Sequence, residues 1–177
     1  DDFVVVIGAG GVGTYSVQIA AAAGAKVVAV DINADRLAPL ESHGAVATVD
    51  ASGRDLRATR DAVRAIAKDA SIPRAGWKIF ECSGTTAGQE SAWSLLGPAA
   101  TLAIVGFTRD AATVRVSNLM AFDATAFGSW GCPPELYPEA VELVRSGQVD
   151  VRPFIRHMPL NQMQEDFEIT NAASEPQ

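Results

Sequence analysis

The sequence predicts an α/β fold: a doubly wound parallel sheet of about six strands with helices on both faces. Three observations predict it. A glycine-rich turn directly follows a short apolar run, apolar runs alternate with helix-length segments along the chain, and glycines or small polar residues follow most of those runs. A chain of 177 residues suits one domain with a sizeable core.

The glycine turn is the most informative stretch. The apolar run 3–7 leads into Gly8-Ala-Gly-Gly-Val-Gly13, and a run of small residues suited to a helix follows. Gly8 permits a tight turn, Gly10 lets a pyrophosphate approach the backbone, and Gly13 lets the helix pack close to the strands. The N-terminus of that helix offers N–H groups and a positive dipole end to phosphates. These features together predict a Rossmann-type dinucleotide site that includes Gly11 and Val12.

An acid stands at the end of the next apolar run. Asp31 lies 18 positions after Gly13, following Lys26-Val-Val-Ala-Val30. A carboxylate there can accept hydrogen bonds from both ribose hydroxyls of NAD, and it would repel the 2′-phosphate of NADP. The sequence therefore favours NAD as the cofactor.

The rest of the chain continues the alternation of strands and helices. Gly24 closes the first helix, and Thr86 is expected to cap a later one. Further helices are expected at 35–43, 54–70, 86–96, 119–122, 133–144 and 160–170, and further strands at 45–49, 77–82, 101–105, 114–116 and 124–130, with an extended segment at 154–158. Trp77 and Trp93 are expected to pack in the interior, as is Cys82 in its strand.

In a doubly wound sheet the ligand crevice lies at the carboxyl ends of the strands. Besides the glycine turn and Asp31, three short stretches fall at such ends: Ser83-Gly84, Gly106-Phe107 and Ser129-Trp130. They add three further stretches to the predicted site.

Composition narrows the class of protein. A net charge of −7 argues against a nucleic-acid or anionic-membrane surface. No apolar stretch approaches a membrane span and no signal peptide is recognisable, and two isolated cysteines suit a reducing cytoplasm. The first strand starts at residue 3, and residues 171–177 contain no capping element, so residues 1–177 are expected to be one NAD-binding domain excised from a longer chain.

The residues needed for catalysis are not recognisable. Only two histidines occur, His43 and His157, and no Cys/His spacing suits zinc. A Tyr-x-x-x-Lys pair and a G-x-S-x-G elbow are also absent from the sequence. The chain is expected to bind the cofactor, whereas the catalytic groups belong to another part of the parent protein.

Several blocks resemble the coenzyme domain of medium-chain, zinc-dependent alcohol dehydrogenases. They are Gly8-Ala-Gly-Gly-Val-Gly13, Val30-Asp-Ile-Asn-Ala-Asp-Arg36, Glu81-Cys-Ser-Gly84 and Ile104-Val-Gly106. Others, including Gly76-Trp-Lys-Ile-Phe-Glu81, Leu119-Met-Ala-Phe-Asp-Ala124 and Pro134-Glu-Leu-Tyr-Pro138, are similar to 6-hydroxycyclohex-1-ene-1-carbonyl-CoA dehydrogenases. The resemblance covers nearly the whole chain.

The resemblance implies a role for each site residue. Asp31 would bind the adenosine ribose, Arg36 its 3′-hydroxyl side, and Ile32 and Ser83 would flank the adenine. The nicotinamide would lie along Val105, Gly106 and Phe107, with its carboxamide at the backbone of Ser129 and Trp130. Zinc would be held only by a separate N-terminal domain. Coenzyme domains of the family pair edge to edge, which implies a homo-oligomer through residues 113–117.

The resemblance implies oxidation of a secondary alcohol, with a cyclic hydroxyacyl-CoA as one candidate substrate. Two alternatives remain open. One is a non-catalytic nucleotide-sensing module, which would share the glycine turn and the acid. The other is a zinc-free quinone or enoyl reductase of the same superfamily; most of these prefer NADPH, which Asp31 disfavours.

Overall fold

A computed structural model describes residues 2–172 and confirms the predicted architecture. Six parallel strands form one sheet in the order β3-β2-β1-β4-β5-β6. The strands are β1 (Phe3–Ile7), β2 (Lys26–Asp31), β3 (Ala45–Asp50), β4 (Lys78–Glu81), β5 (Thr101–Ile104) and β6 (Thr125–Gly128). Because the order reverses between β1 and β4, a crevice is expected above their carboxyl ends.

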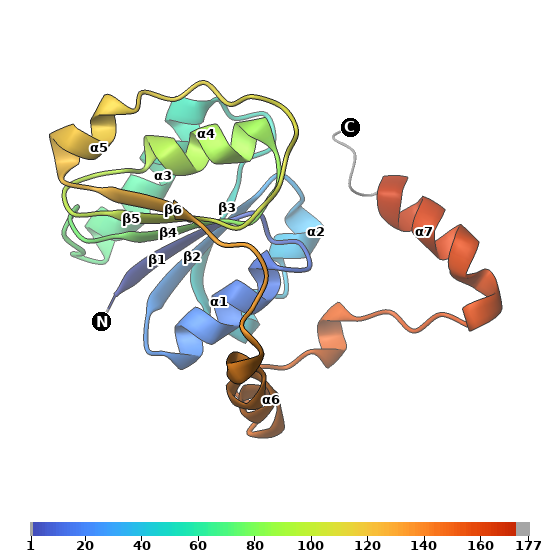
Figure 1. The fold of residues 1–177 in the computed structure, drawn as a ribbon. Coiled ribbons are helices and arrows are strands. Elements are labelled where there is room, and N and C mark those ends of the chain that lie inside the picture. Colours follow the sequence, from blue (N-terminus) through green and yellow to red (C-terminus); the bar gives the residue numbers. More distant parts are fainter. Residues whose placement is uncertain (1, 173–177) are drawn as a thin grey trace.

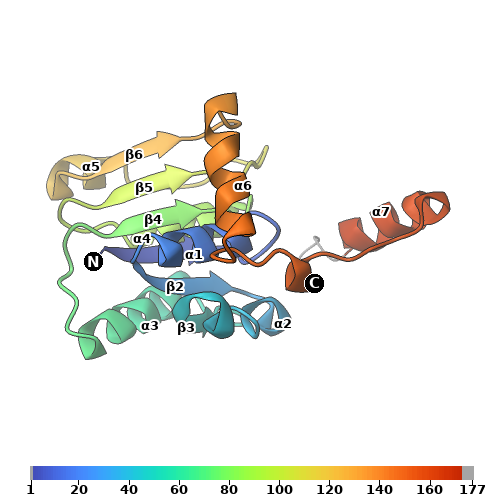
Figure 2. The same cartoon turned by 90° about the horizontal axis from the view of Figure 1, so that it is seen from below.

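Helices cover both faces of the sheet (Figure 1). The helices of the described residues are α1 (Gly13–Ala22), α2 (Ala34–Leu37), α3 (Leu56–Asp69), α4 (Thr86–Ser94), α5 (Ser117–Phe122), α6 (Tyr137–Arg145) and α7 (Met163–Ala172). Of these, α3 and α4 lie on one face and α1 on the other, whereas α7 projects away from the sheet. The arrowheads of β2, β4, β5 and β6 point the same way in Figure 2, so their carboxyl ends share one edge. No helix among residues 2–172 is long and apolar enough to cross a membrane.

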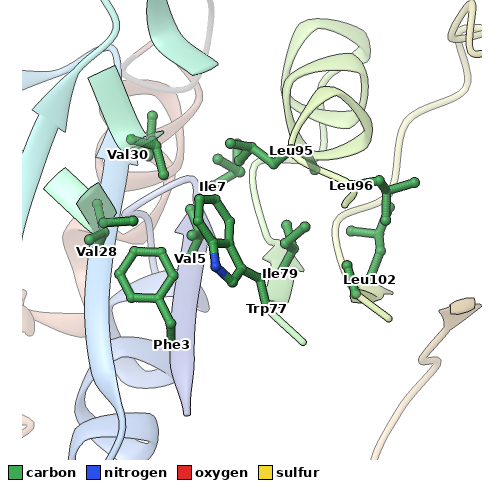
Figure 3. Packing of buried hydrophobic residues seen from close by; sticks show 14 of the residues in the cluster. Phe3, Val5, Ile7, Val28, Val30, Trp77, Ile79, Leu95, Leu96 and Leu102 are labelled. Atoms are coloured by element: carbon green, nitrogen blue, oxygen red, sulfur yellow. The ribbon is translucent and has the colours of Figure 1, made fainter. Parts of the chain in front are cut away.

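Alternate residues of β1 and β2 enter two separate cores. Val5 and Val28 pack with α3 and α4 on one face, whereas Val6 and Val27 pack with α1 on the other. Continuous apolar strands are needed here because the sheet is buried on both faces. In the first core Trp77 lies edge-on to Phe3, with ring centroids 4.8 Å apart, and its indole N–H donates to the Pro73 carbonyl (Figure 3).

Some predicted elements differ from the observed ones. Residues 111–115 form no strand, so the strand predicted at 114–116 is wrong, and the expected dimer edge at 113–117 is irregular chain leading into α5. Val114 and Val116 give too short an apolar pattern to specify a strand, and Val116 is the N-cap residue of α5. The outer strand on that side is β6.

Other corrections are local. Thr85, not Thr86, caps α4, because its side chain accepts a hydrogen bond from the Gly88 N–H. The helix predicted at 35–43 is split into α2 and a 3₁₀ turn, Glu41–His43, and the segment predicted as extended begins within another 3₁₀ turn, Arg152–Phe154. The stretch expected to lack a cap, 171–177, lies largely outside the described residues.

Candidate functional site

The glycine turn lies between β1 and α1 and is tightly held. Gly8 has a φ of +93° and donates its N–H to the Val30 carbonyl, and a Cβ on it would come within 2.6 Å of the Ser83 backbone. A Cβ on Gly13 would collide with the Gly8 carbonyl oxygen. Both glycines are therefore required by close packing inside the chain.

Gly10 and Gly11 differ from their neighbours. A Cβ on either would meet no atom of the chain within 4 Å, and neither has a positive φ. Internal packing and backbone conformation therefore do not require glycine at these positions. The backbone here is open to the close approach of a ligand, which is the role predicted for Gly10.

Helix α1 begins beside this opening. Its N-cap residue, Val12, provides no side-chain hydrogen bond to the first turn. Thr14 donates its hydroxyl to the Ala9 carbonyl, which fixes the turn against the helix. The Thr14 N–H itself donates to the Gly10 carbonyl. The positive end of the helix is thus presented at the carboxyl end of the sheet, where it favours phosphate oxygens.

Asp31 ends β2 and is 8% exposed. Its Oδ2 accepts a hydrogen bond from the Ala9 N–H at 2.6 Å, and its Oδ1 accepts one from the Asn33 N–H at 2.8 Å. The carboxylate therefore fixes the glycine turn to β2. Each oxygen keeps a further lone pair, so both can still accept from ribose hydroxyls.

The predicted adenosine-side residues follow Asp31 directly. Ile32 is exposed, and Asn33 caps α2 by accepting from the N–H groups of Asp35 and Arg36. This cap places Arg36 in the short helix just beyond the acid, half-buried. These residues lie directly after β2, and their contacts with a nucleotide stay a prediction.

A second group of residues gathers at the ends of β4, β5 and β6. A Cβ on Gly84 would lie 2.9 Å from the Phe107 carbonyl oxygen, so these two loops touch. The rings of Phe107 and Trp130 are edge to face, with centroids 6.4 Å apart, and Trp130 is 91% exposed. Ser129 donates its N–H to the Ile104 carbonyl. The structure thus brings Ser83, the 105–107 loop and the 129–130 loop to one edge.

Sequence reasoning missed Glu81 as a site residue. It ends β4 and is 0% exposed. Its Oε1 accepts hydrogen bonds from the Ser83 N–H at 2.8 Å and from the Ser83 hydroxyl at 2.5 Å. An acid closing an apolar strand was the available signal, and it matches the position of Asp31 on β2.

The two cysteines differ in exposure, and neither belongs to a cluster of metal ligands among the described residues. Cys82 is half-buried just after β4, not inside the strand as predicted, and its sulfur lies 3.8 Å from the Ser16 hydroxyl. Burial raises the pKa of the Cys82 thiol to about 11. Cys132 is exposed. Residues 2–172 contain no group of three or more His, Cys, Asp or Glu side chains that could hold a metal ion, so they do not fit a zinc site.

Comparison with known proteins decides the family. A sequence model described as zinc-binding dehydrogenase matches residues 11–146, which is most of the chain. The chain belongs to the zinc-binding dehydrogenase family. As a family member it is an alcohol-dehydrogenase-type domain of the medium-chain superfamily, as the resemblance predicted.

Individual relatives agree with this assignment. The chain is 29% identical to galactitol 1-phosphate 5-dehydrogenase of Escherichia coli over 87% of its own length and 45% of the relative. It is 30% identical to a putative D-xylulose reductase of Agrobacterium fabrum over 87% of its own length and 42% of that relative. A solved alcohol dehydrogenase zinc-binding domain protein from Burkholderia ambifaria superposes with a TM-score of 0.83 at 26% identity. The match covers 97% of this chain and 46% of the solved one. The chain thus spans less than half the length of each.

Proposed function

We propose that the chain is the NAD-binding domain of a zinc-dependent alcohol dehydrogenase. The observation that carries this proposal is the pair Gly10 and Gly11, which are glycines with no internal reason to be so, at the open N-terminus of α1. A pyrophosphate that packs against this backbone supplies the reason. The predicted site from Gly8 to Gly13, with Asp31, then holds the adenosine half of the cofactor.

Asp31 supports NAD rather than NADP. Its carboxylate is held in place by the Ala9 and Asn33 N–H groups, so it cannot easily withdraw from a 2′-phosphate. Two hydroxyls can donate to it, whereas a phosphate dianion would meet a fixed negative charge.

The nicotinamide half is proposed to lie along Val105, Gly106 and Phe107, with the backbone of Ser129 and Trp130 at the carboxamide. When bound, NAD supplies the hydride acceptor for oxidation of an alcohol. This chain would bind and orient that cofactor. Zinc and the groups that move the proton are proposed to belong to a part of the parent protein beyond these 177 residues.

The proposed substrate is a secondary alcohol. The printed names of the relatives, a galactitol phosphate dehydrogenase and a D-xylulose reductase, support a polyol or its phosphate. A cyclic hydroxyacyl-CoA rests only on the sequence blocks that are similar to that subfamily.

A nucleotide-sensing module is a second candidate, because the glycine turn and Asp31 alone would suit it. The ring pair of Phe107 and Trp130 disfavours it, because an adenosine-only site does not need an aromatic surface at the far strand ends. A zinc-free reductase is disfavoured by Asp31.

Calorimetric titration of the 177-residue chain with NADH, NADPH and AMP tests the proposal. NADH is expected to bind at least tenfold more tightly than NADPH, and more tightly than AMP. Equal or tighter NADPH binding would contradict the role of Asp31. Equal affinity for AMP and NADH would favour the sensing module.

A further inference from the structure

Glu81 is the most deeply buried charged side chain near the site. Its Oε2 has no hydrogen-bond partner among the described residues. A buried polar atom without a partner is unfavourable, and such atoms are uncommon in native proteins. An apolar residue would fill the same place at the end of β4 without that penalty, so stability alone does not account for a glutamate here.

The contacts of Glu81 reach two loops. Through Oε1 it holds the Ser83 N–H and hydroxyl, which fixes the loop after β4. Its backbone carbonyl accepts hydrogen bonds from the N–H groups of both Val105 and Gly106, each at 2.9 Å, which fixes the loop after β5. The side chain thus holds the loop after β4, and the backbone carbonyl of the same residue, which any side chain at position 81 would leave in place, holds the loop after β5, so a shift of residue 81 would move both loops.

Two glycines make room for this carboxylate. A Cβ on Gly106 would lie 2.7 Å from Oε2 of Glu81, and a Cβ on Gly88 would lie 2.9 Å from Oε1. A Cβ on Gly106 would also collide with the Gly84 N–H. The loops and the start of α4 are thus built closely around the glutamate side chain, and they leave little freedom for it to move.

We propose that Glu81 is a positioning residue for the nicotinamide half of the cofactor: it fixes the 105–107 loop against the 83–84 loop. This inference rests on the proposed function, since it takes Val105, Gly106 and Phe107 as the nicotinamide-side wall. Glu81 itself is buried behind these loops and acts through them.

Three substitutions separate positioning from structural support. Glu81→Gln keeps an oxygen that accepts from Ser83 and keeps the side-chain length. Glu81→Asp keeps the carboxylate but withdraws it by one methylene. Glu81→Met fills the space and removes both oxygens. Glu142→Met is the matched control, because Glu142 lies exposed on α6 and pairs with Arg145.

The measurements are the affinities of the 177-residue chain for NADH and for AMP, together with its thermal midpoint. We expect Glu81→Asp and Glu81→Met to weaken NADH binding about tenfold, the effect of losing one buried hydrogen bond. AMP binding should fall by less than NADH binding, because Gly8 to Gly13 and Asp31 are untouched and, on the adenosine side, Ser83 loses its contact with Glu81. Glu81→Gln should keep NADH affinity within about threefold, and the control should leave both affinities unchanged.

The outcomes are distinct. If Glu81→Met and Glu81→Asp bind NADH as tightly as the unsubstituted chain, or if NADH and AMP affinities fall in equal proportion, the positioning role is wrong. If Glu81→Met does not fold, Glu81→Asp decides by the same criterion. If the unsubstituted chain fails to bind NADH, the proposed function fails, and that result is distinct from binding that is merely insensitive to residue 81.

Discussion

The Oδ2 of Asp31 lies 2.6 Å from the backbone nitrogen of Ala9, 22 positions earlier in the chain. This hydrogen bond joins the end of β2 to the glycine turn after β1. Since Asp31 also has its Oδ1 engaged by the Asn33 N–H, the carboxylate has a fixed orientation before any ligand arrives. The acid that predicts cofactor preference is therefore also part of the turn's own structure.

Asp31→Asn tests both roles. An amide oxygen can still accept from one of the two N–H groups, whereas the amide nitrogen cannot accept from the other, so the free energy of unfolding should fall by about 1 kcal/mol. Loss of the negative charge should bring NADPH affinity to within about threefold of NADH affinity. Denaturant unfolding and calorimetric titration measure the two effects.

The control for this prediction is Asp35→Asn, since Asp35 lies exposed in α2. It should change neither stability nor cofactor preference. An Asp31→Asn variant that keeps its preference for NADH would show that the charge does not select the cofactor.

The glycines of the turn should separate binding from folding. A Cβ on Gly13 collides with the Gly8 carbonyl, so Gly13→Ala should destabilise the chain by about 3 kcal/mol or more. A Cβ on Gly10 meets no atom of the chain within 4 Å, so Gly10→Ala should change the free energy of unfolding by less than about 0.5 kcal/mol. It should nevertheless weaken NADH binding at least tenfold, because the methyl group would occupy the proposed pyrophosphate position.

Gly53→Ala and Gly24→Ala do not serve as controls here, because both glycines have positive φ. Gly11→Ala is the informative comparison, since its site is equally open. If Gly10→Ala and Gly11→Ala both bind NADH normally, no ligand approaches this backbone and the glycine turn is not a pyrophosphate site.

Much of this fold could be predicted from the sequence because a parallel sheet that is buried on both faces needs continuous apolar strands. The runs ending at Ile7, Asp31 and Glu81 are of this kind, and helix periodicity fixed α3 to within two residues of the observed ends. The edges of the molecule were less predictable. Val114 and Val116 alternate as strand residues do, and this predicted a strand. The prediction failed because alternation alone does not show whether a neighbouring strand lies close enough to pair.

The site was predictable in part for the same reason. Gly8, Gly13 and Asp31 belong to a pattern with fixed spacing, and parallel topology then brings the strand ends to one edge. Glu81 was not recognised because its importance depends on contacts with Ser83 and Gly106, and the second of these lies 25 positions away. No local pattern records a buried carboxylate oxygen without a partner.

Cys82 should react slowly with thiol reagents at neutral pH. Burial raises its pKa to about 11, so the thiolate that reacts is scarce at pH 7. In a Cys132→Ser variant, the rate of reaction with a disulfide reagent should rise about tenfold per pH unit until the pH approaches 11. A Cys82→Ser variant, which retains exposed Cys132, should react much faster at pH 7.

The same shift has a consequence for stability. The folded state holds the Cys82 proton more tightly than the unfolded chain, whose thiol pKa is near 9.0. The contribution of the protonated Cys82 thiol to the free energy of unfolding is therefore complete below pH 9 and is lost as the pH rises toward 11. Cys82→Ser should flatten this part of the stability curve. A Cys82 rate as fast as that of Cys132 at pH 7 would contradict the burial of its sulfur.

Gln18 should secure the chain after α6 to the body of the fold. Its side chain lies buried on α1, donates from Nε2 to the Asp150 carbonyl at 3.1 Å, and accepts at Oε1 from the Asp150 N–H at 2.7 Å. Gln18→Leu removes both hydrogen bonds at nearly constant volume and leaves the Asp150 backbone groups without these partners, which should cost about 1 to 3 kcal/mol. Hydrogen exchange at the Asp150 amide should speed up more than at Val5 in β1, because the loss is local to the docked segment.

Gln164→Leu, on exposed α7, is the matched control and should alter neither amide. Equal acceleration at Asp150 and Val5 would mean that Gln18 supports the whole domain, whereas no acceleration at Asp150 would show that the segment is held by other contacts, such as the ring pairs of Phe154 with Tyr15 and His43.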